Sequence, residues 1–220
     1  MAKFINIHQI SGKVGDKVYC RGKGSSSYVR SLGIPKNEPS IAQLNCRFKL
    51  KMAVEFLNPL RQLLEACWTD SSARKEDGFN GAAGYFIKNA FTGIYPELQI
   101  NYEEVRFSKG RLAWPADAKM VLDNHSVLVS WKNFGFPMAW PDDEAIVVLY
   151  NEEYNVFRLF RNSAIREQEY AILQLSEEFA RGTLYGYLFF CNYTGKLVSK
   201  TLYLGKVTAA GTGDSIETIR

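Results

Sequence analysis

The sequence contains little of the chemistry on which most enzymes depend. Its 220 residues include two histidines, His8 and His125, and four cysteines that form no Cys-x-x-Cys pair. The glycines of Gly12–Ser31 are spaced wrongly for a phosphate-binding loop, because six residues separate Gly15 from Gly22 where four are required. We therefore predict that the protein is not an enzyme, that it uses no cofactor or metal, and that its cysteines are buried free thiols.

Long hydrophobic runs are also missing. No stretch of roughly 18 apolar residues occurs, as a membrane-spanning helix would require, and the first residues, MAKFINIHQISGK, contain no apolar segment of secretory length. The expected location is the cytoplasm, with a virion or a surface assembly as the alternative. Hydrophobic residues make up 46% of the chain, so a substantial folded core is expected.

Positive charge is concentrated in the N-terminal third. Residues 1–75 carry 13 Lys and Arg against 5 Asp and Glu, a net charge of +8, and the remaining residues carry 14 against 18, a net charge of −4. The candidate interaction residues of this part are Lys13, Lys17, Arg21, Lys23, Tyr28 and Arg30. Basic side chains interleaved with tyrosines suit phosphates and bases, and they equally suit an acidic protein surface. No known nucleic-acid motif accompanies them, so we favour the protein surface.

The pattern of β-forming and helix-forming residues changes along the first hundred residues. Residues 4–31 alternate short β-forming runs with Gly, Ser and Lys, which is typical of hairpins. A capping box formed by Ser40 and Gln43 predicts the start of a helix that Asn58-Pro59 should break. Apolar residues surround most of this helix, so we expect it to be buried on more than one side. A further helix is expected over residues 80–91.

From Leu98 onward, short apolar runs of period two are separated by Gly, Pro, Asn and Asp. This spacing is typical of an antiparallel sandwich. The predicted fold class is therefore α+β and mainly β, with N-terminal β-hairpins and two to three helices followed by an immunoglobulin/fibronectin-like antiparallel β-sandwich. We expect a basic strand-plus-helix segment at residues 1–97, a sandwich domain at 98–207 and a polar tail at 208–220.

Two further patterns offer candidate contacts. The tripeptide Ala-Trp-Pro occurs twice, and Trp114 and Trp140, if exposed, would stack on sugar rings or on a protein partner. Packing at strand edges is the alternative for both. Carboxylates cluster at residues 142–144 and 152–153. We expect them to be solvated charges at strand ends, and a Ca²⁺ site or an acid and base pair is the less favoured interpretation.

A resemblance to a known family rests on four segments in this order: SGKVGDKVYCRGKGSSSYVRS, SIAQLNCRFKLKMAVEFLNPL, KNAFTGIYP and YLFFCNYTGKLVSKTLYLG. Together they resemble a domain-of-unknown-function family of Bacteroidota whose members have roughly this length. The resemblance covers residues 11–205 and implies no reaction, cofactor or catalytic residue.

The function predicted from these observations is that of a non-enzymatic structural or interaction protein. It is expected to join a larger protein assembly, as a homo-oligomer or with other subunits, through its basic hairpins, its sandwich edges or its tail. A nucleic-acid-associated or ribosome-associated module that uses the basic third is the first alternative, and a glycan-binding sandwich is the second.

Overall fold

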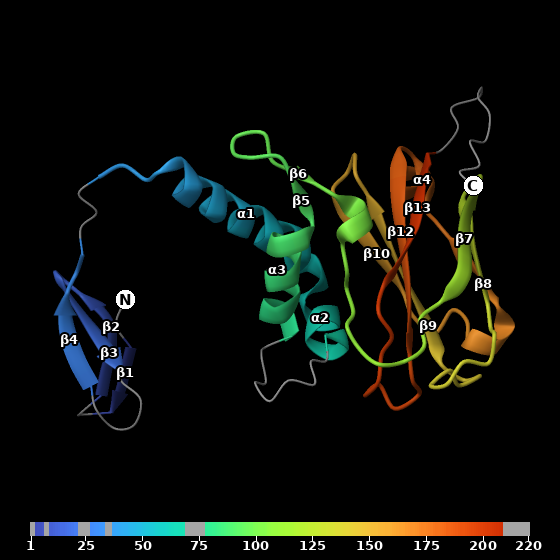
Figure 1. Cartoon of the computed structure of the whole chain (residues 1–220), viewed down its shortest axis with the longest axis horizontal. Helices are drawn as coiled ribbons and strands as arrows, with labels where there is room; N and C mark the ends of the chain where they lie inside the picture. Colours follow the sequence, from blue (N-terminus) through green and yellow to red (C-terminus); the bar gives the residue numbers. More distant parts are fainter. Residues whose placement is uncertain (1–2, 7–8, 22–26, 34–36, 69–77, 209–220) are drawn as a thin grey trace. The chain divides into compact units, whose positions relative to one another are not determined.

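The computed structural model describes residues 3–6, 9–21, 27–33, 37–68 and 78–208. The chain is divided into two units, Met1–Ile41 and Ala42–Arg220 (Figure 1). Lys23, the segment 69–77 and residues 209–220 of the expected polar tail lie outside the described residues.

The first unit contains one antiparallel sheet of four strands in sequence order. Its strands are β1 (Lys3–Asn6), β2 (Gln9–Val14), β3 (Lys17–Arg21) and β4 (Ser27–Ser31). Gly15 turns the chain between β2 and β3 with φ +58°, a left-handed conformation that glycine adopts without steric cost. The hairpins expected at the N-terminus are confirmed.

Three helices open the second unit. They are α1 (Ile41–Leu57), α2 (Arg61–Cys67) and α3 (Gly78–Asn89). A short 3-10 turn, η1 (Asn58–Leu60), separates α1 from α2. Pro59 lies in this turn, where a ring without an N–H ends the α-helical ladder as the sequence predicts.

The expected burial of α1 on several sides is wrong for its first half. Ile41 at its start is 68% exposed and Leu50 just past its midpoint is 52% exposed, and the buried residues of the helix are Ala53, Phe56 and Leu57 near its end. Apolar residues around a helix therefore indicate burial only along the part of the helix that other elements cover.

Two antiparallel sheets form the larger part of the second unit (Figure 1). The four-stranded sheet has the order β10-β9-β12-β13, from β9 (Glu144–Asn151), β10 (Val156–Phe160), β12 (Thr183–Cys191) and β13 (Leu202–Thr208). The three-stranded sheet has the order β11-β8-β7, from β7 (Ala116–Asp123), β8 (Ser126–Lys132) and β11 (Tyr170–Gln174). The short elements are β5 (Phe91–Thr92), β6 (Gln99–Ile100), η2 (Tyr102–Glu104), η3 (Arg166–Gln168) and α4 (Glu177–Ala180).

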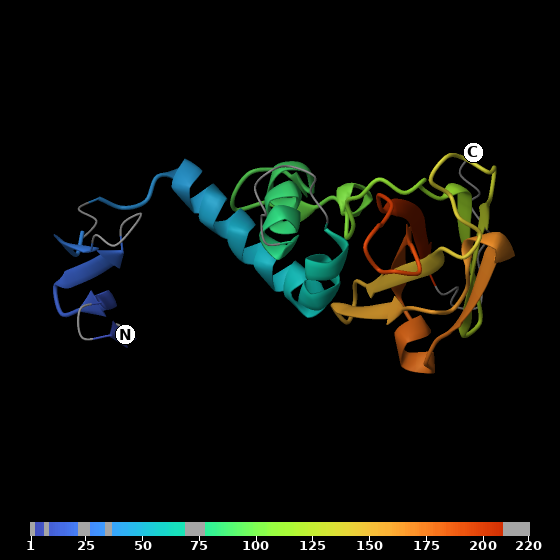
Figure 2. The same cartoon turned by 90° about the horizontal axis from the view of Figure 1, so that it is seen from below.

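Strand β9 shows how the layers are joined. Its residues Ala145, Val147 and Leu149 belong to the core shared with the three-stranded sheet. The alternate residues, among them Ile146 and Val148, belong to a second core with α1, α2 and α3. The four-stranded sheet is thus covered on both faces, by helices and by the other sheet (Figures 1 and 2). The boundary expected after residue 97 separates elements that share one hydrophobic core.

The cysteines differ in their burial. Cys67 and Cys191 are buried, as expected, whereas Cys20 is half-buried and Cys46 is exposed, which the sequence reading did not predict. Burial raises the pKa of Cys67 to about 12, because the thiolate would lose its hydration there. No described helix is long and apolar enough to cross a membrane.

Candidate interaction surfaces

Five large apolar side chains lie exposed on two loops of the second unit. Trp114 is 57% exposed in the segment before β7, and four others lie between β8 and β9 with exposed fractions of 56%, 47%, 39% and 41%. In chain order these four are Phe134, Phe136, Met138 and Trp140. We call the five residues the aromatic loop surface. The tryptophans named from the sequence are therefore exposed, and strand-edge packing does not account for them.

A backbone contact and a buried arginine join the two loops. The Ala113 N–H donates to the carbonyl oxygen of Met138 at 3.0 Å, which places the two Ala-Trp-Pro motifs beside each other. Arg166 donates from Nη2 to the carbonyl oxygen of Ala113 at 2.8 Å and from Nε to Oδ2 of Asp143 at 2.9 Å. Its guanidinium lies 3.7 Å from the centroid of the Phe190 ring, so a cation–π contact stabilises the charge in addition to these hydrogen bonds.

Asp143 connects this arginine to the second motif. Its Oδ2 also accepts the Trp140 N–H at 3.0 Å, and its carbonyl oxygen accepts the Arg166 N–H at 2.8 Å. Burial raises the pKa of the Asp143 carboxyl, while the Trp140 N–H and Arg166 act in the opposite direction. The expectation that the carboxylates of residues 142–144 are solvated is wrong for Asp143, which is fully buried and ion-paired.

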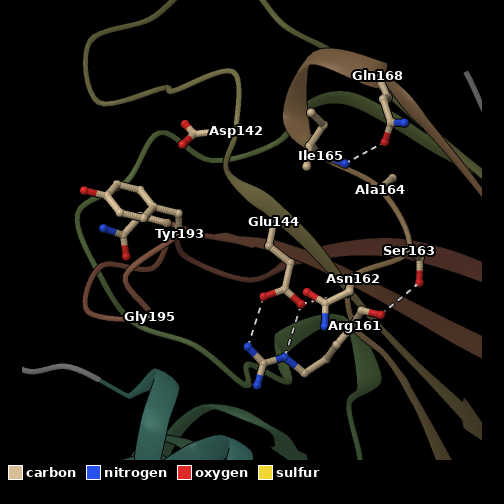
Figure 3. A pocket seen from close by; sticks show the side chains of 11 residues that line it. Asp142, Glu144, Arg161, Asn162, Ser163, Ala164, Ile165, Gln168, Tyr193 and Gly195 are labelled. Carbon is tan, nitrogen blue, oxygen red and sulfur yellow. Dashed lines mark hydrogen bonds and ion pairs between the residues drawn. The ribbon is translucent and has the colours of Figure 1, made fainter.

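A polar pocket of about 650 Å³ lies where β9 begins and where β10 and β12 end (Figure 3). Glu144 and Arg161 form a two-pronged ion pair in it, with nitrogen to oxygen distances of 3.2 Å and 3.0 Å. Oε1 of Glu144 also accepts the Asn162 N–H at 2.8 Å. Glu144 and Arg161 therefore neutralise each other's charge inside the pocket. Among the described residues, no group of three or more His, Cys, Asp or Glu is arranged to hold a metal ion.

The N-terminal sheet distributes its basic residues over both faces. Lys13 lies opposite Val18, and Val18 lies opposite Arg30, so Lys13 and Arg30 share one face. Tyr28, opposite Cys20, lies on that face as well. Lys17 and Arg21 occupy alternate positions of β3 and therefore lie on the other face. The candidate basic residues thus do not form one continuous track, and Lys23 is not among the described residues.

The side chains described in this sheet are open to solvent on both faces. Within residues 11–21 and 27–33 no residue is buried, and Tyr28 and Val29 are 56% and 52% exposed. Lys13, Lys17, Arg21 and Arg30 form no ion pair with another described residue. A single sheet of this size gains most of its stability from a covered apolar face, and the described side chains of residues 11–21 and 27–33 contribute no buried residue to one.

A family model described as "Family of unknown function (DUF6266)" matches residues 9–205. The chain belongs to this family. The DUF6266 match begins in β2 and ends in β13, so it includes three of the four strands of the N-terminal sheet, the helices and nearly all of the sandwich. The family resemblance seen in the sequence is confirmed, and the origin in Bacteroidota stays a prediction. No curated protein matches the sequence.

Sequence reasoning missed part of the surface in this DUF6266 protein. Phe134, Phe136 and Met138 were not singled out, although their segment FGFPM combines large apolar residues with the turn formers Gly135 and Pro137. That combination is the signal, because a turn between two strands has little opportunity to bury such side chains. Arg166 carries no comparable local signal, since its partners Asp143 and Ala113 lie 23 and 53 residues away in the sequence.

Proposed function

We propose that the protein is a non-enzymatic component of a larger protein assembly and that it binds a partner protein through the aromatic loop surface. The observation that supports this proposal best is the exposure of Trp114, Phe134, Phe136, Met138 and Trp140 on two loops held together by a buried arginine. Large exposed apolar groups gathered in one place are costly in water and are typical of interaction sites.

The composition of the surface favours a protein partner. Trp, Phe and Met are enriched at protein interfaces, and tryptophans often contribute much of the binding energy there. The hydrogen bonds of Arg166, Asp143 and Ala113 hold both loops before binding, which lowers the entropy lost when a partner docks.

The proposal is tested by replacing the two tryptophans in the full chain, Trp114→Ser and Trp140→Ser together. The matched control is Tyr193→Ser, because Tyr193 is 81% exposed and lies outside the aromatic loop surface. Proteins retained from an extract of the source organism by wild type are identified, purified and titrated against all three forms. We expect the double substitution to weaken binding of the true partner by about 30-fold or more, and the control to leave it unchanged.

Equal binding of a purified partner to wild type and to the double variant would contradict the proposal. The exposed tryptophans also support the glycan alternative, because indole rings stack on sugar faces. A glycan array screened with the same three proteins separates the two candidates. An oligosaccharide that binds wild type and the control, and quenches tryptophan fluorescence, would replace the protein partner by a glycan.

Nucleic-acid binding receives less support from the first unit. Lys13 and Arg30 lie on one face, and Lys17 and Arg21 lie on the other, so a single phosphate backbone would meet only part of the charge. A gel shift that weakens steeply with salt, and is lost in Lys13→Glu with Arg30→Glu, would restore this alternative.

A further inference from the structure

We propose that β4 pairs with β4 of a second copy of the chain in an antiparallel register centred on Val29, which joins two N-terminal sheets into one. This inference goes beyond the proposed function, because it concerns the other unit of the chain and a different surface.

Strand β4 has an open edge in the described sheet. It is the last strand in the order β1-β2-β3-β4, and all five of its residues are exposed. An open edge presents unpaired backbone N–H and C=O groups, which are a template for another strand.

The hydrogen bond that continues the β3 and β4 ladder shows which groups point outward. The Leu32 N–H donates to the carbonyl oxygen of Asp16 at 2.6 Å, one step beyond the Lys17 and Ser31 pair. Bonded and non-bonded positions alternate in an antiparallel ladder, so Tyr28 and Arg30 direct their backbone groups towards β3. The backbone groups of the intervening positions, Ser27, Val29 and Ser31, therefore point to the open edge.

A register centred on Val29 uses all of these outward groups. Val29 then lies opposite Val29 of the second copy, and Ser27 lies opposite Ser31, so each outward donor and acceptor has a counterpart. A register centred on Arg30 would place two guanidinium groups directly opposite each other, which is unfavourable. A register centred on Tyr28 would leave Ser31 without a described counterpart.

The side chains of β4 are complementary in the same register. Tyr28 of each copy lies opposite Arg30 of the other, and a guanidinium beside a tyrosine ring is a favourable pair. On the other face, Val29 shares its row with Tyr19 of β3. The two copies together then form the apolar row Tyr19, Val29, Val29, Tyr19 across the new contact.

Charge distinguishes a second copy from an acidic partner. Residues 1–41 carry seven Lys and Arg against two Asp and Glu, so two such units repel each other at low ionic strength. Salt screens this repulsion, and self-association should strengthen as salt rises, whereas binding to an acidic protein should weaken. The edge of a five-residue strand is short, so the dimer is expected to depend strongly on protein concentration.

Site-directed cross-linking of the full chain tests the register. Cys20→Ser and Cys46→Ser first remove the two cysteines that are not buried. Tyr28→Cys is then mixed with a size-tagged Arg30→Cys chain and oxidised. Residues 28 and 30 face each other at a non-hydrogen-bonded position, where strands approach closely enough for a disulfide. We expect a mixed disulfide dimer at about tenfold or more the yield of dimers from either variant alone. Val14→Cys, at an exposed residue outside β4, controls for random collisions.

Sedimentation of the full chain without added cysteines supplies an independent measurement. We expect dimers to increase with protein and salt concentration, and Val29→Lys to abolish them while leaving the circular dichroism spectrum unchanged. A chain that stays monomeric at every salt concentration, a dimer that persists in Val29→Lys, or equal cross-linking by all cysteine variants would each overturn the proposal. Replacing Trp114 and Trp140 should not change sedimentation or cross-linking through β4. Failure of one proposal therefore does not imply failure of the other.

Discussion

At the scale of single residues, Arg166 holds the aromatic loop surface in place. Its side chain is buried against Phe190 and bonds to Asp143 and Ala113. We predict that Arg166→Leu lowers the free energy of unfolding by about 3–5 kcal/mol, because it leaves the Asp143 carboxylate buried without its counter-charge. Urea denaturation followed by circular dichroism measures this change.

Arg161→Leu is the control for this prediction. Arg161 pairs with Glu144 at 3.0 Å, but its side chain is 46% exposed, so its loss should cost about 1 kcal/mol or less. Similar losses for the two variants would show that the Arg166 pair has no special role.

The sequence predicted the exposure of individual side chains correctly where neighbouring residues in the chain determine it. Trp114 and Trp140 were named as candidates because each stands beside a proline, and both are exposed. It failed for Asp143, which is buried, although the adjacent carboxylate Asp142 is exposed as expected. Their difference is set by Arg166, a residue of a distant turn, and no local pattern contains that information.

At the scale of secondary-structure elements, α3 offers two glycines in contrasting surroundings. A Cβ at Gly81 would lie 2.7 Å from Nε1 of the buried Trp68, whereas a Cβ at Gly84 would meet nothing within 4 Å. We predict that Gly84→Ala stabilises the protein by about 0.5–1 kcal/mol, because alanine restricts the unfolded chain and favours the helix. Gly81→Ala should destabilise it by about 1–3 kcal/mol through overpacking. Thermal unfolding of both variants measures the difference, and the same sign for both would contradict the argument.

The elements themselves were largely predictable. The hairpins of residues 3–31 and the break at Pro59 follow from turn residues and from the missing proline N–H. The exposed first half of α1 was not predictable, because periodicity reports which side chains are apolar and contains no information on whether another element lies beside them.

At the scale of the whole molecule, the two units should differ in their importance for stability. The hydrophobic cores of the second unit contain no residue before Ala53. We predict that a chain shortened to residues 40–220 retains the midpoint of thermal unfolding of the full chain to within about 2–4 °C, since it keeps both hydrophobic cores described above. Differential scanning calorimetry makes this comparison.

A chain shortened to residues 98–220 is the matching control. It lacks Phe56 and Phe86, which are buried in the core that covers one face of β9 and β12. We expect it to aggregate or to lose cooperative unfolding, because that face would become a large exposed apolar area. If it unfolded like the longer chain, the helices would have no part in the core.

The layering of the second unit was only partly visible in the sequence. Alternating patterns predicted the sandwich, but the run AIVVLY of β9 does not alternate, and seven of the eight residues of this strand are buried. A continuous apolar run indicates a strand covered on both faces. That signal predicts a third layer, which the reading of a separate sandwich from residue 98 overlooked.

The helices that cover β9 and β12 precede both strands in the sequence, and this order matters while the chain is being synthesised. Residues 41–89, which contain the three helices, leave the ribosome before β9 at residues 144–151 and β12 at residues 183–191. Both strands contain long apolar runs that are buried in the folded protein, and such runs are prone to aggregate while exposed. Because their cover is synthesised first, each strand meets a surface that can bury it as soon as it emerges, so the chain order itself protects the nascent protein.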